Sequence, residues 1–202
     1  MGIFSDLIPG GGGKAGKMSA QESPELSRAR ENNEQGRDIF PALAETYRVA
    51  QRYPGGIPQN VIDKVRKGVG SDDPVAQDYQ LFDTLAGRAA LAKLKLFAPV
   101  SNAEFPIAKS IGANPVLKFD NNKQIIGQDF SNASRAYFQN AFKQRWAAKN
   151  GGLNGRDKQG HSYAEDLSRV MRQPGIQNLM QAPWKRKGAA KAKVIDFNEL
   201  DD

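Results

Sequence analysis

The chain has 202 residues, of which 39% are hydrophobic, and its mean hydropathy is −0.61. Both values are low for a compact globule of this length, so we expect elongated helices and flexible ends instead of one thick core. The absence of cysteine and the single histidine exclude disulfides and thiolate sites, and we expect no metal and no cofactor. The formal net charge of +7 favours a polyanionic partner, either DNA or an anionic membrane surface.

Residues 1–20 form an apolar, glycine-rich arm. Its apolar side chains either contact a membrane or a neighbouring subunit, or belong to a disordered end: Ile3, Phe4, Leu7 and Ile8. Residues 11–17 match the letters of a phosphate-binding loop, but Met18 stands where that loop needs Ser or Thr, so we expect no nucleotide site. No apolar run is long enough to span a bilayer as a helix, and the start does not match a signal peptide.

Residues 21–70 are predicted to form helices that glycine and proline separate. Ser23 followed by Pro24 is typical of a helix start, with the serine as cap and the proline in the first turn. The helix that follows is highly polar, and such a helix needs a packing partner or frays. A more amphipathic helix is predicted over residues 38–52, and a shorter one follows Pro58.

Residues 71–182 hold the longest helical pattern. Asp73 before Pro74 predicts the start of a helix that ends before Pro99, because the residue preceding a proline avoids the helical region. Spacings of three and four predict its buried face: Phe82, Leu85, Ala89, Ala92 and Leu96. We expect this central helix to be the longest in the chain.

Shorter helices are predicted after it. Residues 101–104 have the form of a capping box, and a turn follows at residues 112–115. Asp120 is a candidate cap for a helix that carries Ile125 and Ile126 inward. A separate helix from Ser131 places three aromatic rings at i, i+4 spacing: Phe138, Phe142 and Trp146. These rings predict core packing or, if they are exposed, a platform that stacks nucleic-acid bases.

The last part of the chain contains a loop, a helix and a charged tail. Residues 162–165 have the form of a second capping box, and His161 beside it is expected to be a surface or packing residue. From residue 183 the composition becomes basic and then acidic. The cations form either a solvated arm or a site that binds phosphates without reading sequence: Lys185, Arg186, Lys187, Lys191 and Lys193. Residues 194–202 alternate apolar and acidic character, which suits a peptide that docks on another subunit.

Several segments, taken in order, resemble a helical module of bacteriophage proteins. Residues 82–85 have the pattern F-x-x-L, and residues 98–105, further along the chain, are APVSNAEF. Residues 121–126 are NNKQII, and residues 146–155 are WAAKNGGLNG. Similar PVSxxE, N-x-x-I-L and W-x-x-x-N-G-S-L-x-G phrases occur in the internal virion, or DNA-ejection (pilot), proteins of short-tailed phages and in related virion structural proteins. The resemblance covers about half of the chain.

The resemblance implies a protein of the virion, inside the capsid or near the portal. It would be packaged with the genome and ejected beside it, helping to form a DNA conduit through the host envelope. Its partners would be other copies of itself, other virion or ejection proteins, phage DNA bound without sequence preference, and the host membrane. The alternative is a non-specific DNA-binding virion or portal-associated structural protein without an envelope role.

An enzyme, for instance a peptidoglycan lyase, is the third possibility. Larger proteins of the resembled group often carry a peptidoglycan-cleaving domain, but no acidic residue here is placed with a partner for that chemistry. We therefore expect no catalytic residue and no enzyme activity.

The predicted fold is all-α and elongated, with amphipathic helices joined by glycine and proline breaks and with flexible arms at both ends. We expect an N-terminal arm over residues 1–20, N-terminal helices over 21–70, a central helical module over 71–182 and a tail over 183–202. Strand signals are almost absent from the sequence.

Overall fold

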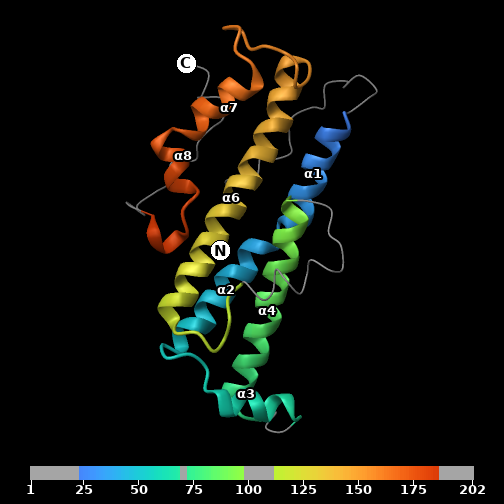
Figure 1. The fold of residues 1–202 in the computed structure, drawn as a ribbon. Coiled ribbons are helices and arrows are strands. Elements are labelled where there is room, and N and C mark those ends of the chain that lie inside the picture. Colours follow the sequence, from blue (N-terminus) through green and yellow to red (C-terminus); the bar gives the residue numbers. More distant parts are fainter. Residues whose placement is uncertain (1–22, 69–71, 98–111, 187–202) are drawn as a thin grey trace.

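The computed structural model describes residues 23–68, 72–97 and 112–186, and within these ranges it contains helices and no strand (Figure 1). The predicted all-α fold is therefore confirmed. The elements are α1 (Pro24–Gly36), α2 (Ile39–Arg52), α3 (Gln59–Arg66), α4 (Pro74–Phe97), α6 (Phe119–Asn150), α7 (Tyr163–Met171), α8 (Pro174–Leu179) and the 3₁₀ turn η2 (Pro183–Lys185). In Figure 1 the molecule is longer than it is wide: α1, α2, α4 and α6 form a bundle, and α7 and α8 fold back along α6.

The starts of α1, α4 and α7 follow the capping signals in the sequence. The N–H group of Leu26 donates to the Ser23 hydroxyl at 3.4 Å, and the N–H group of Val75 donates to the Asp73 carboxylate at 2.8 Å. At α7 the capping box is complete, because Glu165 accepts from the backbone N–H of Ser162 while the Ser162 hydroxyl accepts from that of Glu165. These contacts satisfy N–H groups that would otherwise lack a partner in the first turn.

The main core lies between α2, α4 and α6. Its buried members are Ile39, Phe40, Ala42, Leu43, Ala89, Ala92, Leu96, Ile126, Phe130, Ala133, Ala136 and Ala182. Phe82 and Leu85 are also buried, in a neighbouring cluster with Val49 and Ala50 of α2. The buried face predicted for the central helix is thus confirmed.

The polar helix α1 finds its packing partner inside the chain. It lies against α4 and α6, and the Asn33 side chain donates to the carbonyl of Tyr137 at 3.2 Å. Gly36, at its C-terminal end, is in close contact with the fully buried Leu96 of α4. Because a small residue stands at this crossing, the backbones of α1 and α4 can approach closely.

A second core joins the C-terminal half of α6 to α7 and α8. Its buried members are Phe138, Phe142, Trp146, Val170, Ile176 and Met180. The three aromatic rings are at most 8% exposed, so the core interpretation of the stripe is confirmed and the base-stacking interpretation is wrong for these rings.

Three expectations for the central module are wrong. Instead of one helix near Asp120 and another from Ser131, α6 is a single helix of 32 residues, and it exceeds the 24 residues of α4. Its N-cap residue is Lys118, and Asp120 lies in the first turn without capping it. Burial on both sides of Ser131, at Phe130 and Ala133, outweighs the weak helix propensity of the serine and asparagine between them.

The sequence assigned residues 183–186 to the tail, but the structure places them against the bundle. Ala182 is fully buried in the main core, and Trp184 packs against the same core. Other expectations fall outside the described residues: the apolar arm with Ile3, Phe4, Leu7 and Ile8, the capping box at 101–104, and Lys187, Lys191 and Lys193. No helix among the described residues is long and apolar enough to cross a membrane.

Candidate polyanion-binding face

Two of the cations predicted to bind phosphates, Lys185 and Arg186, lie where η2 crosses α6. We call the surface here the basic-aromatic face and define it by Tyr47 of α2, Phe119 and Lys123 of α6, and the segment 184–186. Three helical elements that are distant in sequence thus meet at one place. The chemistry of the face depends on which of its groups are already engaged and which are free.

The aromatic rings of this face pack on one another. The Trp184 and Tyr47 rings are stacked, with centroids 3.9 Å apart and an interplanar angle of 11°. Tyr47 also contacts Phe119, with centroids 5.5 Å apart, and Trp184 contacts the edge of Phe130 at 6.3 Å. The indole N–H of Trp184 is buried and has no hydrogen-bond acceptor within the described part of the chain. Because their faces are used within the protein, these rings hold the segment in place and do not offer a base-stacking surface.

Arg186 is an anchor for this segment. Its guanidinium donates to the carbonyls of Leu179, at 2.8 Å, and Gln181, at 3.1 Å, and it lies 5.9 Å from the centroid of the Phe130 ring. Burial lowers the pKa of the Arg186 guanidinium from its ordinary value. Two of its donor groups therefore serve the chain itself, which favours a structural role for Arg186 over a phosphate contact.

Lys123 and Lys185 are the available cations of the face. Lys185 is exposed, and its Cε and Nζ atoms lie 3.5 Å from the point that a Cβ atom on Gly127 would occupy. Lys123 is one turn earlier on the same side of α6, and its Nζ atom lies 5.7 Å from the centroid of the Phe119 ring. Among the described residues neither ammonium group has a carboxylate partner, so both can bind an anion from outside. Sequence reasoning missed Lys123, although its i, i+4 relation to Phe119 and Gly127 was visible.

A second cluster of titratable groups lies beside the start of α7. One ligand atom from each of Asp157, His161 and Asp166 lies within 4.8 Å of the others. However, the Asp157 carboxylate already accepts from the backbone N–H groups of Gln159 and His161 and faces His161 Nδ1 at 2.9 Å, while Asp166 pairs with Arg169. A cation would have to displace these partners. The geometry is that of a loop held by internal hydrogen bonds, in which His161 is a partly exposed residue that pairs with Asp157.

Hydrogen bonds also shift the acidity of two carboxyl groups there. Burial raises the pKa of Asp157, but the bonds from the side chain and backbone of His161 and from the backbone of Gln159 outweigh it, and the pKa is lowered. Bonds from the backbone and then the side chain of Ser162 lower the pKa of Glu165. Both groups are thus stabilised as carboxylates that hold the loop on α7.

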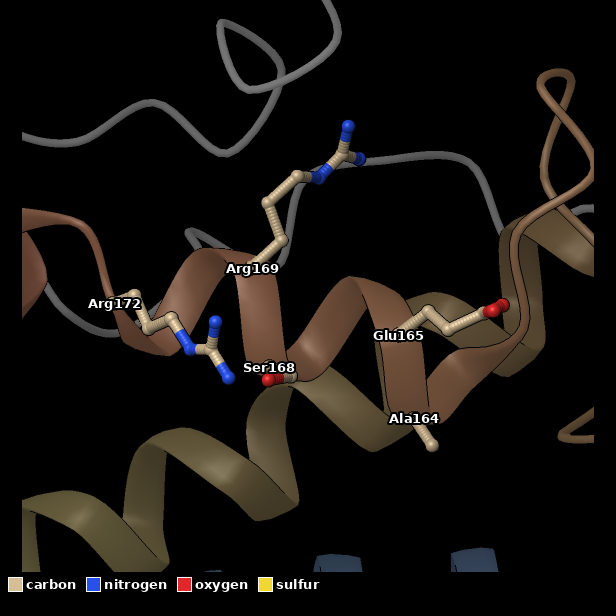
Figure 2. A pocket seen from close by; sticks show the side chains of 5 residues that line it. All are labelled: Ala164, Glu165, Ser168, Arg169 and Arg172. Carbon is tan, nitrogen blue, oxygen red and sulfur yellow. The ribbon is translucent and has the colours of Figure 1, made fainter.

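A broad depression lies beside α7 (Figure 2). Its volume is about 610 Å³, and it is lined by Ala164, Glu165, Ser168, Arg169 and Arg172. Figure 2 shows the Glu165 carboxylate and the Arg169 guanidinium pointing in different directions from the helix. Since these side chains do not converge on a common point, the depression has no arrangement for acid–base or nucleophilic chemistry.

The motif residues of the resemblance have structural roles in the part of the chain that is described. Asn122 is 2% exposed: its Oδ1 atom accepts from the N–H of Asn114 at 2.9 Å, and its Nδ2 atom donates to the carbonyls of Asn114 and Leu117 at 2.8 and 3.1 Å. The amide of Asn122 thus ties the turn before α6 to the helix, and this buried network accounts for an asparagine at the first motif position.

The phrase over residues 146–155 forms the end of α6. Trp146 is buried, the Asn150 side chain donates to its carbonyl at 3.1 Å, and Gly151 ends the helix with φ +72°. A Cβ atom on Gly155 would lie 1.8 Å from the carbonyl oxygen of Asn150. Gly151 is therefore explained by its left-handed backbone, and Gly155 by its close approach to the Asn150 carbonyl.

The chain has no match among the known proteins with which it was compared. No family model matches it, and neither a curated protein nor a solved structure is significantly similar.

Proposed function

We propose that this chain is a structural protein of a bacteriophage particle, packaged with the genome and ejected beside it to help form a DNA conduit through the host envelope. The observation that carries the proposal is the ordered set of segments that resemble phage ejection proteins. Two of them, residues 121–126 and 146–155, lie near the two ends of the single helix α6. Two motif segments at the ends of one helix, each with buried residues, suit a packing module of a structural component.

The bundle geometry supports the same proposal. A helix of 32 residues spans about 48 Å, long enough to place different partners at its two ends. Two leucines of α4, Leu81 and Leu91, are 44% and 38% exposed and provide apolar contacts of the kind that subunits bury in an assembly. In this proposal the neighbours are other copies of the chain and other virion proteins, and the apolar arm with Ile3 and Phe4 contacts a membrane or a sister subunit.

Mass spectrometry of purified phage particles before and after DNA ejection tests the proposal. The expected result is that peptides of this chain are present in full particles and depleted from emptied ones, while capsid peptides stay constant. Equal retention in emptied particles would remove the ejection role. Binding to anionic vesicles that depends on residues 1–9 would support the envelope step.

The alternative function is that of a non-specific DNA-binding virion or portal-associated protein without an envelope role. The specific observation in its favour is the basic-aromatic face, where Lys123 and Lys185 lack carboxylate partners within the described residues. It predicts DNA affinity that falls steeply with salt and no dependence of vesicle binding on residues 1–9. Retention in emptied particles together with such DNA binding would favour it.

A further inference from the structure

We infer that the basic-aromatic face binds the phosphate backbone of double-stranded DNA through Lys123 and Lys185, and that Arg186 positions this contact without making it. The inference deepens the proposed function and rests on it only in the choice of DNA as the polyanion. It assigns the contact to folded residues of α6 and η2, one of which, Lys123, lies far from the basic tail in sequence.

The first step of the argument is the arrangement of charge. The Lys185 ammonium lies beside Gly127, and Lys123 is four residues earlier on α6, so the backbone positions 123 and 127 are about 6 Å apart along the helix axis. Two lysine side chains on successive helical turns can reach neighbouring phosphates of one strand. The acidic residues on this stretch of α6 are Asp120 and Asp129, and Asp129 already pairs with Lys93 of α4. Lys118, exposed at the N-cap, adds a further cation.

The second step is the rigidity of Lys185. Trp184 is stacked on Tyr47 and Arg186 is bonded to two carbonyls, so the residues on both sides of Lys185 are fixed. A cation on a fixed backbone loses less conformational entropy on binding than one on a free arm.

The third step decides between classes of partner. Single-stranded nucleic acid is bound largely by stacking on exposed rings, and a membrane surface by apolar side chains that insert between lipids. The rings at this face pack against one another and against Phe130 in the protein. The rings are half-buried, and the exposed side chains beside them are the cations Lys118 and Lys185. Exposed positive charge fits the phosphates of a duplex and implies binding without sequence preference.

The test uses the full chain and fluorescence anisotropy with a labelled duplex of arbitrary sequence, measured between about 50 and 200 mM salt. The double variant K123Q/K185Q is compared with K64Q/K67Q, which removes the same charge from exposed residues in and just after α3. The expected result is that K123Q/K185Q lowers the slope of log affinity against log salt by about 2 and weakens low-salt binding roughly tenfold. K64Q/K67Q is expected to change the slope by less than about half of that amount.

Other results would overturn the inference. Equal losses in the two double variants would show that only net charge matters, and an unchanged slope in K123Q/K185Q would show that the face does not contact DNA. Loss of binding to phosphatidylserine vesicles by K123Q/K185Q, with DNA binding intact, would assign the face to a membrane instead. Circular dichroism melting checks that each variant is folded. The inference and the proposed function fail separately, because particle mass spectrometry can exclude ejection while the DNA contact stands.

Discussion

At the scale of single residues, Asn122 contributes to the stability of the fold through a buried hydrogen-bond network. It is a buried polar residue whose amide makes all of its bonds to the turn that precedes α6. Replacing it with alanine leaves the N–H of Asn114 and the carbonyl of Leu117 without their partner. We expect Asn122→Ala to lower the free energy of unfolding by about 3 kcal/mol, measured by urea denaturation.

The neighbouring Asn121 gives the matched control. It is exposed on α6, and Asn121→Ala is expected to change the free energy of unfolding by less than about 0.5 kcal/mol. If the two alanine variants were equally stable, the buried amide network would not have the role assigned to it.

Replacing two helical glycines with alanine is expected to change the stability of the protein in opposite directions. A Cβ atom on Gly36 would lie 2.7 Å from Cδ1 and 3.0 Å from Cβ of the buried Leu96, so Gly36→Ala must push α1 from α4 and is expected to cost about 2 kcal/mol. A Cβ atom on Gly127 would meet nothing closer than 3.5 Å, and Gly127→Ala is expected to stabilise the protein by about 0.5–1 kcal/mol through helix propensity. Thermal melts of both variants check the signs, and a stable Gly36→Ala protein would contradict the close crossing.

At the scale of elements, helix starts could be predicted from the sequence and helix continuity could not. Ser23, Asp73 and the box at Ser162 are local signals that act through the first turn, so sequence alone contains them. Whether α6 continues through Gly127 depends on distant contacts, since Ile126 and Phe130 are buried against other helices. The Ser131 hydroxyl also bonds the Gly127 carbonyl at 2.9 Å, within the helix. Burial of side chains against other helices therefore outweighs the low local helix propensity, and the helix continues.

In the basic-aromatic face, too, some features could be predicted from the local sequence and others depend on distant contacts. The basic character of residues 185–187 is visible in the composition, but the docking of Trp184 on Tyr47 is not, because the two residues are far apart in the sequence. Arg186 donates hydrogen bonds to two backbone carbonyls, whereas Lys185 is exposed. The sequence around these two residues does not show this difference.

The capping box of α7 makes the stability of this element depend on pH. The pKa of Glu165 is lowered in the folded protein, so its carboxylate contributes stability above the unfolded pKa, near 4.5, and that contribution is lost as the pH falls through the lower folded value. Glutamine can keep the box but cannot titrate. We expect Glu165→Gln to reduce the fall in melting temperature between about pH 5 and pH 3.

The same substitution at an exposed residue of α1, Glu34→Gln, provides the comparison. It leaves the box intact, so the acid-induced fall in melting temperature should persist in full. Identical pH profiles for the two glutamine variants would mean that the box does not couple folding to protonation.

The segment around η2 is held chiefly by one ring. Trp184 stacks on Tyr47 and contacts the edge of Phe130, so Trp184→Ala removes packing from the main core and is expected to cost about 2 kcal/mol in urea denaturation. Trp184→Phe keeps part of the stack and leaves no buried indole N–H, so it is expected to cost less than about 1 kcal/mol. A loss as large for phenylalanine as for alanine would contradict the stacking role.

At the scale of the whole molecule, α6 joins two hydrophobic cores, and the main core has more buried residues than the second. Its first half is packed among α2 and α4 with Ile126 and Phe130. Its second half holds Phe142 and Trp146 against α7 and α8, and it also contacts α1, where Lys143 pairs with Glu25. Elements with fewer buried contacts open at lower free energy than the rest of a protein. The amide hydrogens of α7 should therefore exchange sooner than those of α2 and of the first half of α6.

Matched truncations of two buried rings separate the cores. Phe142→Ala empties the smaller core and is expected to speed hydrogen exchange in α7 and α8 while amides of α2 keep their protection. Phe130→Ala removes the same side chain from the main core, where Phe40 packs against it with centroids 5.4 Å apart, and should lower protection throughout the molecule. Hydrogen–deuterium exchange mass spectrometry of both variants measures the contrast. A uniform loss in Phe142→Ala would mean that the two cores unfold as one unit, and that the α7–α8 end cannot rearrange while the bundle stays folded.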